Sequence, residues 1–300
     1  MCKESQAKYD PGLLGPIRDA LAWASPSRCD WCKGERALYM HMQPVVIDSI
    51  RHPWVVHAAK LARDRRYRVR HASLLIGGHR IIQDYLCNGG TISRLAATSE
   101  YLAHHHNVLP ARTSHPAFRI ARHCVEHLTR EAASDGILAE IPLSTEAPFP
   151  AMRRPWLSPR LLVLWSVRDP GNVGALIRSA AAFGWTVLLA GQCADHLSYE
   201  AIRCSQGYSL HVPVGTALAH QLATHLANHT ILHTAPSTFP STLTLSSDPT
   251  NKIAVVLGNE SHGLQDFPLI KRAQPCWIPT KIESLNVAIA GSILMSRFPL

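Results

Sequence analysis

Hydrophobic residues form short, continuous runs in the second half of the chain. The runs span residues 161–167, 185–191 and 253–259, and each has the length of a strand. A turn at Asp169-Pro-Gly-Asn172 and a helix of small residues follow the first run. Strands that are apolar on both faces and alternate with helices are typical of a parallel sheet covered on both sides. The pattern therefore predicts an α/β domain over residues 161–300, with ligands bound beyond the carboxyl ends of its strands.

The first half of the chain has a mixed pattern of helices and strands. The elements expected there are a basic helix, a strand–turn–helix unit and two further strands, at residues 47–66, 71–90, 91–102 and 135–143. We therefore predict a smaller α/β domain over residues 45–142. Residues 143–160 contain four prolines and no periodicity, which predicts a linker. The weakly patterned residues 1–44 are interpreted as an N-terminal extension of uncertain order.

Positive charge is concentrated in one stretch of the first half. The 300 residues have a net charge of +9, and residues 51–70 contain seven Lys or Arg beside one acid, Asp64. Dense positive charge favours a phosphate backbone, so we expect the chain to bind nucleic acid; a solvated helix face is the alternative. No apolar run is long enough to span a membrane, and the first residues lack the apolar core of a secretory signal. These features predict a cytoplasmic or organelle-matrix protein.

Cysteines and histidines do not predict a metal site. Cys29 and Cys32 are the only close pair among eight cysteines; His41 is a candidate third ligand, and no fourth is evident. Residues His104–His106 are adjacent, so a helix would direct them to different faces, and we expect a solvated surface patch. The turn after the first strand lacks the third glycine of the dinucleotide-binding fingerprint, which argues against a dinucleotide-dependent oxidoreductase.

Three motifs with candidate chemistry follow the predicted strands in order. The first is Asn172-Val-Gly174 with Arg178, a charge inside an otherwise apolar helix, where burial is costly without a partner. The second is Leu-Gly-Asn-Glu-Ser-His-Gly-Leu at residues 257–264, and the third is Ile-Pro-Thr-Lys-Ile-Glu-Ser-Leu-Asn-Val-Ala at residues 278–288. Each motif alone has an ordinary interpretation, as a helix start, a turn or a capped helix N-terminus. All three motifs in this order are unlikely to occur by chance, so we interpret them as parts of one functional site.

Together the motifs resemble those of the SpoU, or TrmH, family of RNA ribose 2′-O-methyltransferases, within the SPOUT superfamily. The family patterns are NxGxxxR, an apolar strand ending in GxExxG, and IPxxxxxxSLNVxxA, and the resemblance covers about residues 160–298. The N-terminal half resembles, more loosely, the substrate-binding domain of family members, which is similar to small α/β ribosomal proteins. It departs from that domain at Gly77-Gly78, where the family usually has Glu-Gly. This departure puts in doubt any contact made through that carboxylate.

The resemblance implies a C-terminal α/β-knot domain. Its parallel sheet would have a last segment, about residues 255–298, threaded into a trefoil knot that binds S-adenosylmethionine. The resemblance also implies a homodimer through the knotted domain and methyl transfer to a ribose 2′-hydroxyl of RNA. Ribosomal RNA is favoured over transfer RNA, because the N-terminal domain is typical of family members that act on ribosomal RNA. The alternative is a catalytically silent RNA-binding protein with the same fold.

The resemblance also implies roles for individual residues. Arg178 would assist deprotonation of the hydroxyl by orienting a phosphate or by stabilising the alkoxide. It is not expected to accept the proton itself, because a guanidinium is always protonated. An ion pair of Arg178 with Glu260 that only holds the fold is the alternative. The expected catalytic residues are Arg178, Asn172, Glu260, Ser284 and Asn286. The expected cofactor-binding residues are Leu257, Gly258, Asn259, Ile278, Leu285, Asn286 and Ala288. The expected RNA-binding residues are Lys60, Arg63, Arg65, Arg66, Arg68 and Arg70, with Arg203 and Ser205 from a stretch that resembles the family's RxSxGxxxxxPV.

Overall fold

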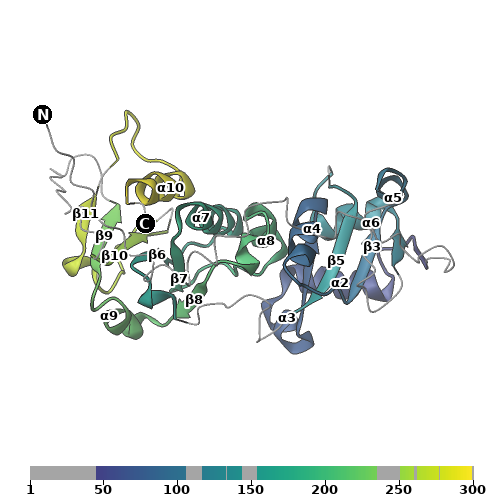
Figure 1. Ribbon diagram of the computed structural model, residues 1–300, viewed down its shortest axis with the longest axis horizontal. Coiled ribbons are helices and arrows are strands. Elements are labelled where there is room, and N and C mark those ends of the chain that lie inside the picture. The colour runs from purple at the N-terminus through teal and green to yellow at the C-terminus, as the bar shows by residue number, and fades with distance from the viewer. Residues whose placement is uncertain are drawn as a thin grey trace, which may run out of the picture. The chain divides into compact units, whose positions relative to one another are not determined.

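The structure is a computed structural model of the chain. It describes residues 45–105, 117–132, 134–143, 154–234, 251–259, 262–276 and 278–298. Cys29, Cys32, His41, His106, Glu260 and the predicted N-terminal extension lie outside the described residues. Two sheets, each with its own helices, make up the described part of the chain (Figure 1).

The described part of the C-terminal half forms a six-stranded sheet in the order β11-β9-β10-β6-β7-β8, and every neighbouring pair is parallel. Its strands are β6 (Arg160–Trp165), β7 (Thr186–Ala190), β8 (Val214–Ala217), β9 (Thr230–Thr234), β10 (Ile253–Leu257) and β11 (Gln274–Cys276). The three apolar runs of the sequence are β6, β7 and β10, at the centre of the sheet. The α/β fold class is therefore confirmed for this half, while the knot itself stays a prediction.

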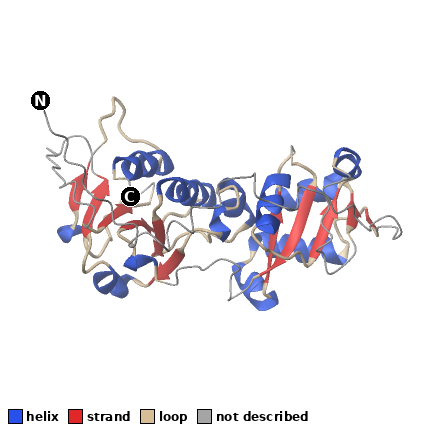
Figure 2. Ribbon diagram, in the orientation of Figure 1, coloured by secondary structure: helices blue, strands red, loops and turns tan. Residues whose placement is uncertain are grey.

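Helices cover both faces of this sheet. On one face lie α7 (Pro170–Phe183) and α10 (Val287–Arg297), and on the other lies the short α9 (Leu222–His225) (Figure 2). Alternate strand residues divide between the two cores: Leu162 and Leu164 pack with α7 and α10, whereas Leu161 and Val163 pack with α9. This is the period-2 alternation of a strand that is buried on both sides. The remaining elements are α8 (Tyr199–Cys204), η5 (Pro155–Leu157), η6 (Tyr208–Leu210), η7 (Ala219–Gln221) and η8 (Ile270–Arg272).

The described part of the N-terminal half forms a five-stranded mixed sheet in the order β1-β4-β3-β5-β2. Strand β5 runs antiparallel to β2 and β3, and the other neighbouring pairs are parallel. The strands are β1 (Val46–Ile47), β2 (Ser73–Gly77), β3 (Arg94–Ala97), β4 (Phe118–Ile120) and β5 (Ile137–Pro142). The helices are α2 (Pro53–Arg63), α3 (Arg65–His71), α4 (His79–Cys87), α5 (Ser99–His104) and α6 (Arg122–Thr129).

Two elements of the N-terminal half differ from the sequence prediction. The single basic helix expected at residues 47–66 is replaced by α2 and α3, because Asp64 has an extended backbone and its side chain accepts from the backbone N–H of Arg66 and Tyr67. That side chain caps the second helix. The strand expected at residues 91–102 ends at Ala97, because Thr98 caps α5 by accepting from Tyr101 N–H. Residues 144–153 of the predicted linker at 143–160 lie outside the described residues, and its last residue, Arg160, begins β6. The domain limits stay predictions.

No helix among the described residues is long and apolar enough to cross a membrane. Within the same residues, no group of three or more His, Cys, Asp or Glu is placed to hold a metal ion.

Candidate ligand-binding and active site

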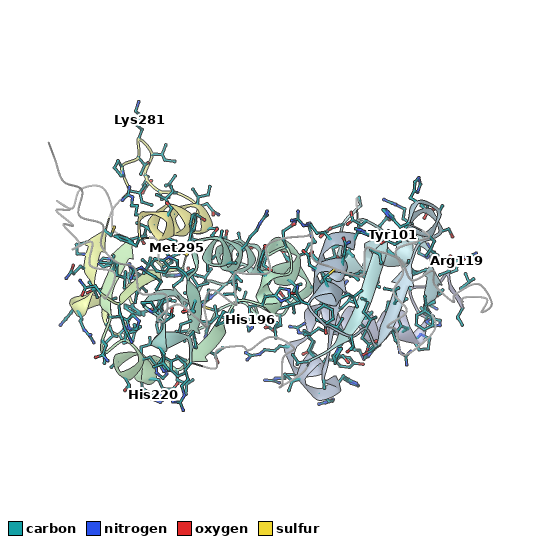
Figure 3. The ribbon with its side chains drawn as sticks, in the orientation of Figure 1. Tyr101, Arg119, His196, His220, Lys281 and Met295 are labelled. Atoms are coloured by element: carbon teal, nitrogen blue, oxygen red, sulfur yellow. The ribbon has the colours of Figure 1, made fainter. Side chains whose placement is uncertain are left out.

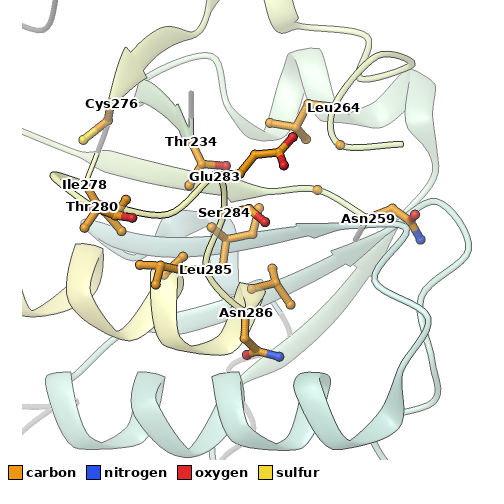
Figure 4. Close-up of a pocket in the computed structure, with 15 residues that line it drawn as sticks. Thr234, Asn259, Leu264, Cys276, Ile278, Thr280, Glu283, Ser284, Leu285 and Asn286 are labelled. Carbon is orange, nitrogen blue, oxygen red and sulfur yellow. The ribbon is translucent and has the colours of Figure 1, made fainter. Parts of the chain in front are cut away.

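A pocket of about 530 Å³ lies at the carboxyl ends of β9, β10 and β11 (Figure 4). Two chain segments form most of it: the hairpin after β10, and the loop that leads from β11 into α10. The pocket is lined by Thr234, Leu257, Gly258, Asn259, Gly263, Leu264, Cys276, Ile278, Thr280, Glu283, Ser284, Leu285, Asn286, Val287 and Ala290. Its position is the one expected for ligands of a parallel α/β sheet.

The hairpin after β10 is held by a pair of backbone hydrogen bonds. Asn259 N–H donates to Gly263 O at 3.1 Å, and Gly263 N–H donates to Asn259 O at 2.8 Å. A Cβ on Gly258 would stand 2.3 Å from Gly263 O, so the close return of the chain requires glycine at 258. The Asn259 amide donates to Ser166 O at 3.0 Å, which ties the hairpin to the end of β6.

The loop before α10 is shaped by a local turn and a helix cap. The Thr280 hydroxyl accepts from Ile282 N–H at 2.9 Å, which is a Ser/Thr turn. Asn286 is the N-cap of α10 and accepts from Ala288 N–H at 2.9 Å. Four residues separate Pro279 from Ser284, whereas the family pattern has six, so this loop is shorter by two residues.

One hydrogen bond joins the first and third motifs. Asn286 Nδ2 donates to Asn172 Oδ1 at 3.0 Å, although the two residues are 114 positions apart. Asn172 stands in the first turn of α7, where Asp169 caps the helix by accepting from Asn172 N–H at 2.6 Å. The two asparagines therefore bring the starts of α7 and α10 together. The helices also meet further along, where Ser179 and Ser292 hydroxyls are 2.7 Å apart.

Arg178 occupies the exposed side of α7, six residues after Asn172. It does not line the pocket, and helix geometry separates the two residues by about 9 Å along the axis. No hydrogen bond or ion pair joins Arg178 to the residues that the structure describes, and Glu260, its expected partner, is outside them. The expectation of a charge buried in an apolar helix is therefore wrong, because the arginine lies on the solvent side of that helix.

Most of the expected cofactor residues come together in the pocket. Leu257, Gly258, Asn259, Ile278, Leu285 and Asn286 line it, and so does the expected catalytic residue Ser284. Ala288 differs, because its side chain is buried in the core between α10 and the sheet. Eight further residues line the pocket and were not among the expected site residues: Thr234, Gly263, Leu264, Cys276, Thr280, Glu283, Val287 and Ala290. The signal for Thr234 was weak, because β9 was not recognised as a strand.

The pocket combines apolar walls with a few polar groups. Ile278, Leu285 and Val287 supply the apolar surface, and burial raises the pKa of the Cys276 thiol, which keeps that group uncharged. Asn259 and Thr280 supply amide and hydroxyl groups. Such a site suits a ligand that has a flat apolar part and several hydrogen-bonding groups.

The basic stretch lies on α2 and α3 and is mostly exposed. Lys60, Arg63, Arg65, Arg66 and Arg70 have exposed side chains. Arg63 is partly engaged, since its guanidinium donates to His127 O at 2.7 Å. These residues form a positive surface, which we call the α2–α3 surface.

Arg68 departs from the rest of that surface. It is 2% exposed, donates to Leu61 O at 2.6 Å, and forms an ion pair with Asp195 at 2.5 Å. The guanidinium lowers the pKa of Asp195, although burial alone would raise it. The expectation that Arg68 contacts RNA is therefore wrong, since its charge is already paired inside the protein.

The stretch at residues 201–214 also differs from expectation. Ser205 is fully buried, donates to Ile202 O at 2.9 Å and accepts from Ser209, so it cannot reach a nucleic acid. Arg203 is half-exposed and forms an ion pair with Glu131. The role of Ser205 is therefore structural: it fixes the turn that follows α8.

Solved structures identify the class of the fold. An rRNA methyltransferase from Sinorhizobium meliloti with bound AdoMet aligns with a TM-score of 0.67 at 23% identity, covering 85% of this chain and 97% of that one. An RNA 2′-O ribose methyltransferase aligns with a TM-score of 0.67 at 24% identity, covering 85% and 99%. At these identities the likeness establishes that this chain shares the fold of these two structures.

A family model also matches the C-terminal half. Residues 159–296, which include the parallel sheet and the whole pocket, match the model of the SpoU rRNA Methylase family. This match agrees with the resemblance that the three motifs carry.

Among curated relatives, a 23S rRNA guanosine 2′-O-methyltransferase from Bacillus subtilis is 27% identical over 45% of this chain and 56% of its own length. A mitochondrial rRNA methyltransferase from Xenopus laevis is 26% identical over 53% of this chain and 38% of its own length. The chain thus spans about half or less of the length of these two relatives. A Synechocystis protein described as an uncharacterized tRNA/rRNA methyltransferase is 27% identical over 83% of this chain and 91% of its own length.

Proposed function

We propose that this protein transfers a methyl group from S-adenosylmethionine to a ribose 2′-hydroxyl of RNA. The observation that carries the proposal is the Asn286–Asn172 hydrogen bond, because it joins the pocket to the helix that bears Arg178. The match of residues 159–296 to the SpoU rRNA Methylase family and the name of the curated relative from Bacillus subtilis support the same reaction. Ribosomal RNA is the favoured substrate because the curated relative from Bacillus subtilis acts on it.

The pocket residues fit the methyl donor. The apolar side chains of Ile278 and Leu285 would hold its adenine, and Asn259 and Thr280 would bond its polar groups. Gly258 and Gly263, which approach each other closely in the hairpin, also line the pocket. When bound, the donor supplies an electrophilic methyl group on a positively charged sulfur. A bond forms between that carbon and the ribose oxygen as the carbon–sulfur bond breaks, and the hydroxyl proton must leave.

The protein's own residues would align the hydroxyl and remove its proton. Asn286 Nδ2 donates to Asn172 Oδ1, and we propose that these two amides orient the ribose. Arg178, exposed on the next turns of α7, would bind an RNA phosphate or stabilise the developing alkoxide. Ser284 and Glu260 are proposed to complete this group. Two such sites would be present in the proposed homodimer, formed through a knotted C-terminal domain.

The α2–α3 surface is proposed to bind the RNA backbone. Its exposed charges, without Arg68, are Lys60, Arg63, Arg65, Arg66 and Arg70. Each phosphate contact releases counterions, so affinity would fall with salt. Replacing Arg65, Arg66 and Arg70 by Ala is expected to weaken RNA binding roughly tenfold and to flatten its salt dependence. A salt slope equal to that of the unchanged protein would count against this surface.

Methyl incorporation tests the reaction. The protein is incubated with methyl-labelled S-adenosylmethionine and unmodified ribosomal or transfer RNA, and the digested nucleosides are separated. The proposal expects label in a 2′-O-methylated nucleoside from one RNA pool. Label on a base instead of a ribose contradicts it. Donor binding by calorimetry without any labelling points to a different RNA, whereas RNA binding without donor binding favours the catalytically silent alternative.

A further inference from the structure

The pocket contains a single charged side chain among the described residues that line it, and this is the carboxylate of Glu283. The other lining residues are neutral. The Glu283 side chain is exposed toward solvent and extends from the loop before α10 toward Leu264 of the hairpin (Figure 4). The carboxylate therefore stands between the two segments that form the pocket.

The loop holds Glu283 in place from both sides. On one side is the Thr280–Ile282 turn, and on the other, three residues on, is the Asn286 cap of α10. The neighbouring Lys281 does not neutralise the carboxylate, because it lies at the outer tip of the loop and points away from the pocket (Figure 3). No ion pair joins Glu283 to another described residue. Its negative charge therefore acts on whatever fills the pocket.

The charge of the proposed donor differs from that of its product. S-adenosylmethionine carries a sulfonium, an ammonium and a carboxylate, so its net charge is positive. Loss of the methyl group leaves a neutral thioether, so S-adenosylhomocysteine has no net charge. One carboxylate near the ligand attracts the net positive donor more strongly than the product, which has no net charge.

We infer that Glu283 is a specificity residue that makes the pocket prefer the cationic methyl donor over the neutral product. The inference rests on the proposed function, since it takes the methyl donor as the ligand. Its consequence is that methyl transfer itself weakens binding, because the reaction removes the positive charge that Glu283 attracts. Glu283 then favours product release and exchange for a new donor.

Calorimetry on the full-length protein tests the inference with three ligands: S-adenosylmethionine, S-adenosylhomocysteine and sinefungin, which carries an amine in place of the sulfonium. Glu283→Gln keeps the size of the side chain and removes its charge. We expect it to weaken binding of the two cationic ligands roughly fivefold to tenfold and that of S-adenosylhomocysteine by less than about twofold. Glu283→Asp should keep most of the preference. Asp266→Asn, at an exposed carboxylate outside the pocket lining, is the matched control and should change none of the three.

Equal weakening of all three ligands by Glu283→Gln would overturn the inference, because it would mean that the side chain only shapes the loop. Unchanged affinities would overturn it as well. If the unchanged protein binds neither the donor nor the product, the proposed function fails and the inference falls with it. If it binds both equally well, the proposed function survives and the inference alone is wrong.

Discussion

The polar side chains of the C-terminal pocket differ in their hydrogen-bond partners from a buried polar side chain of the N-terminal sheet. In the pocket, Glu283, Ser284 and Asn286 are exposed and bond at most to nearby loop or helix groups. In the N-terminal half, the buried Glu140 accepts from Trp54 Nε1 at 3.3 Å and lies 3.2 Å from His57 Nε2. The first set leaves atoms available for a ligand, and the second holds its own fold together.

The two sheets also differ in strand direction. All the paired strands of the C-terminal sheet are parallel, so their carboxyl ends meet at one edge, and the loops that follow them converge there. In the N-terminal sheet β5 runs opposite to β2 and β3, so its carboxyl end lies at the other edge. The residues that follow β2 and β3 still meet, since His79 Nδ1 lies 2.6 Å from the Tyr101 hydroxyl and the His79 ring stacks on that of His105. These groups contact one another, whereas the loops at the carboxyl ends of β9, β10 and β11 line a pocket.

The largest effect on stability is expected at Arg68, a buried charged side chain on α3. Arg68→Ala leaves the partly buried Asp195 without its ion-pair partner, and we expect the free energy of unfolding to fall by about 3 kcal/mol. Arg65→Ala, on the exposed side of the same helix, should change it by less than about 0.5 kcal/mol. Urea denaturation of the two variants measures both. Equal losses of stability in the two variants would mean that the ion pair of Arg68 contributes no more to stability than the exposed Arg65 does.

Arg178 tests whether an exposed charge next to the pocket serves the reaction. Arg178→Ala should lower the rate of methyl transfer by about 10²–10³-fold, because it removes a group proposed to stabilise developing negative charge. Donor affinity should change little, since Arg178 does not line the pocket. Lys271→Ala makes the same change in net charge at an exposed position outside the pocket and serves as the control. Normal activity of Arg178→Ala would remove the role assigned to this residue.

A buried histidine of the C-terminal half gives a pH-dependent difference. Burial lowers the pKa of His211 to about 4, against about 6.5 in the unfolded chain. The unfolded state therefore takes up a proton first as the pH falls, and the stability present above pH 6.5 is lost as the pH falls toward 4. Between pH 7.5 and 5 this loss should be about 2 kcal/mol. In urea denaturation, the stability of His211→Asn should therefore fall by about 2 kcal/mol less than that of the unchanged protein over this pH range. An equal fall in both proteins would contradict the lowered pKa of His211.

The smallest effect is expected at the junction of the first and third motifs. Asn286→Ala removes the N-cap of α10 and the bond to Asn172, and we expect a loss of about 1 kcal/mol of stability. Asn286→Asp keeps the cap acceptor but not the amide donor, so it should recover most of the stability and little of the methyl-transfer activity. Recovery of both would show that only the cap matters.

The central strands and the pocket could be predicted from sequence for physical reasons. Continuous apolar runs mark strands buried on both faces, and residues such as Gly258 and Asn286 are required by a tight turn and a helix cap. Strands β9 and β11 could not be recognised, because β9 contains His233 and β11 contains Pro275, and neither is a continuous apolar run.

The sequence also could not predict which charged side chains are buried and which are exposed. Residues 51–70 contain seven basic residues, six of them between residues 60 and 70, so their spacing does not single out Arg68 as the buried one. Its partner, Asp195, is 127 residues away, and only the folded chain brings the two together. Ser205 is similar, because its burial follows from the packing of the turn after α8.

Hydrogen exchange read by mass spectrometry tests the central claim most directly, because it follows both regions in one experiment. S-adenosylmethionine is predicted to slow exchange in the hairpin at residues 258–265 and in the segment 278–290, and to leave residues 53–71 unchanged. Unmodified ribosomal RNA is predicted to slow exchange at residues 53–71. Slower exchange at 53–71 on adding the donor alone, or no change in the two pocket segments, would contradict the division of the chain into a donor pocket and an RNA-binding surface.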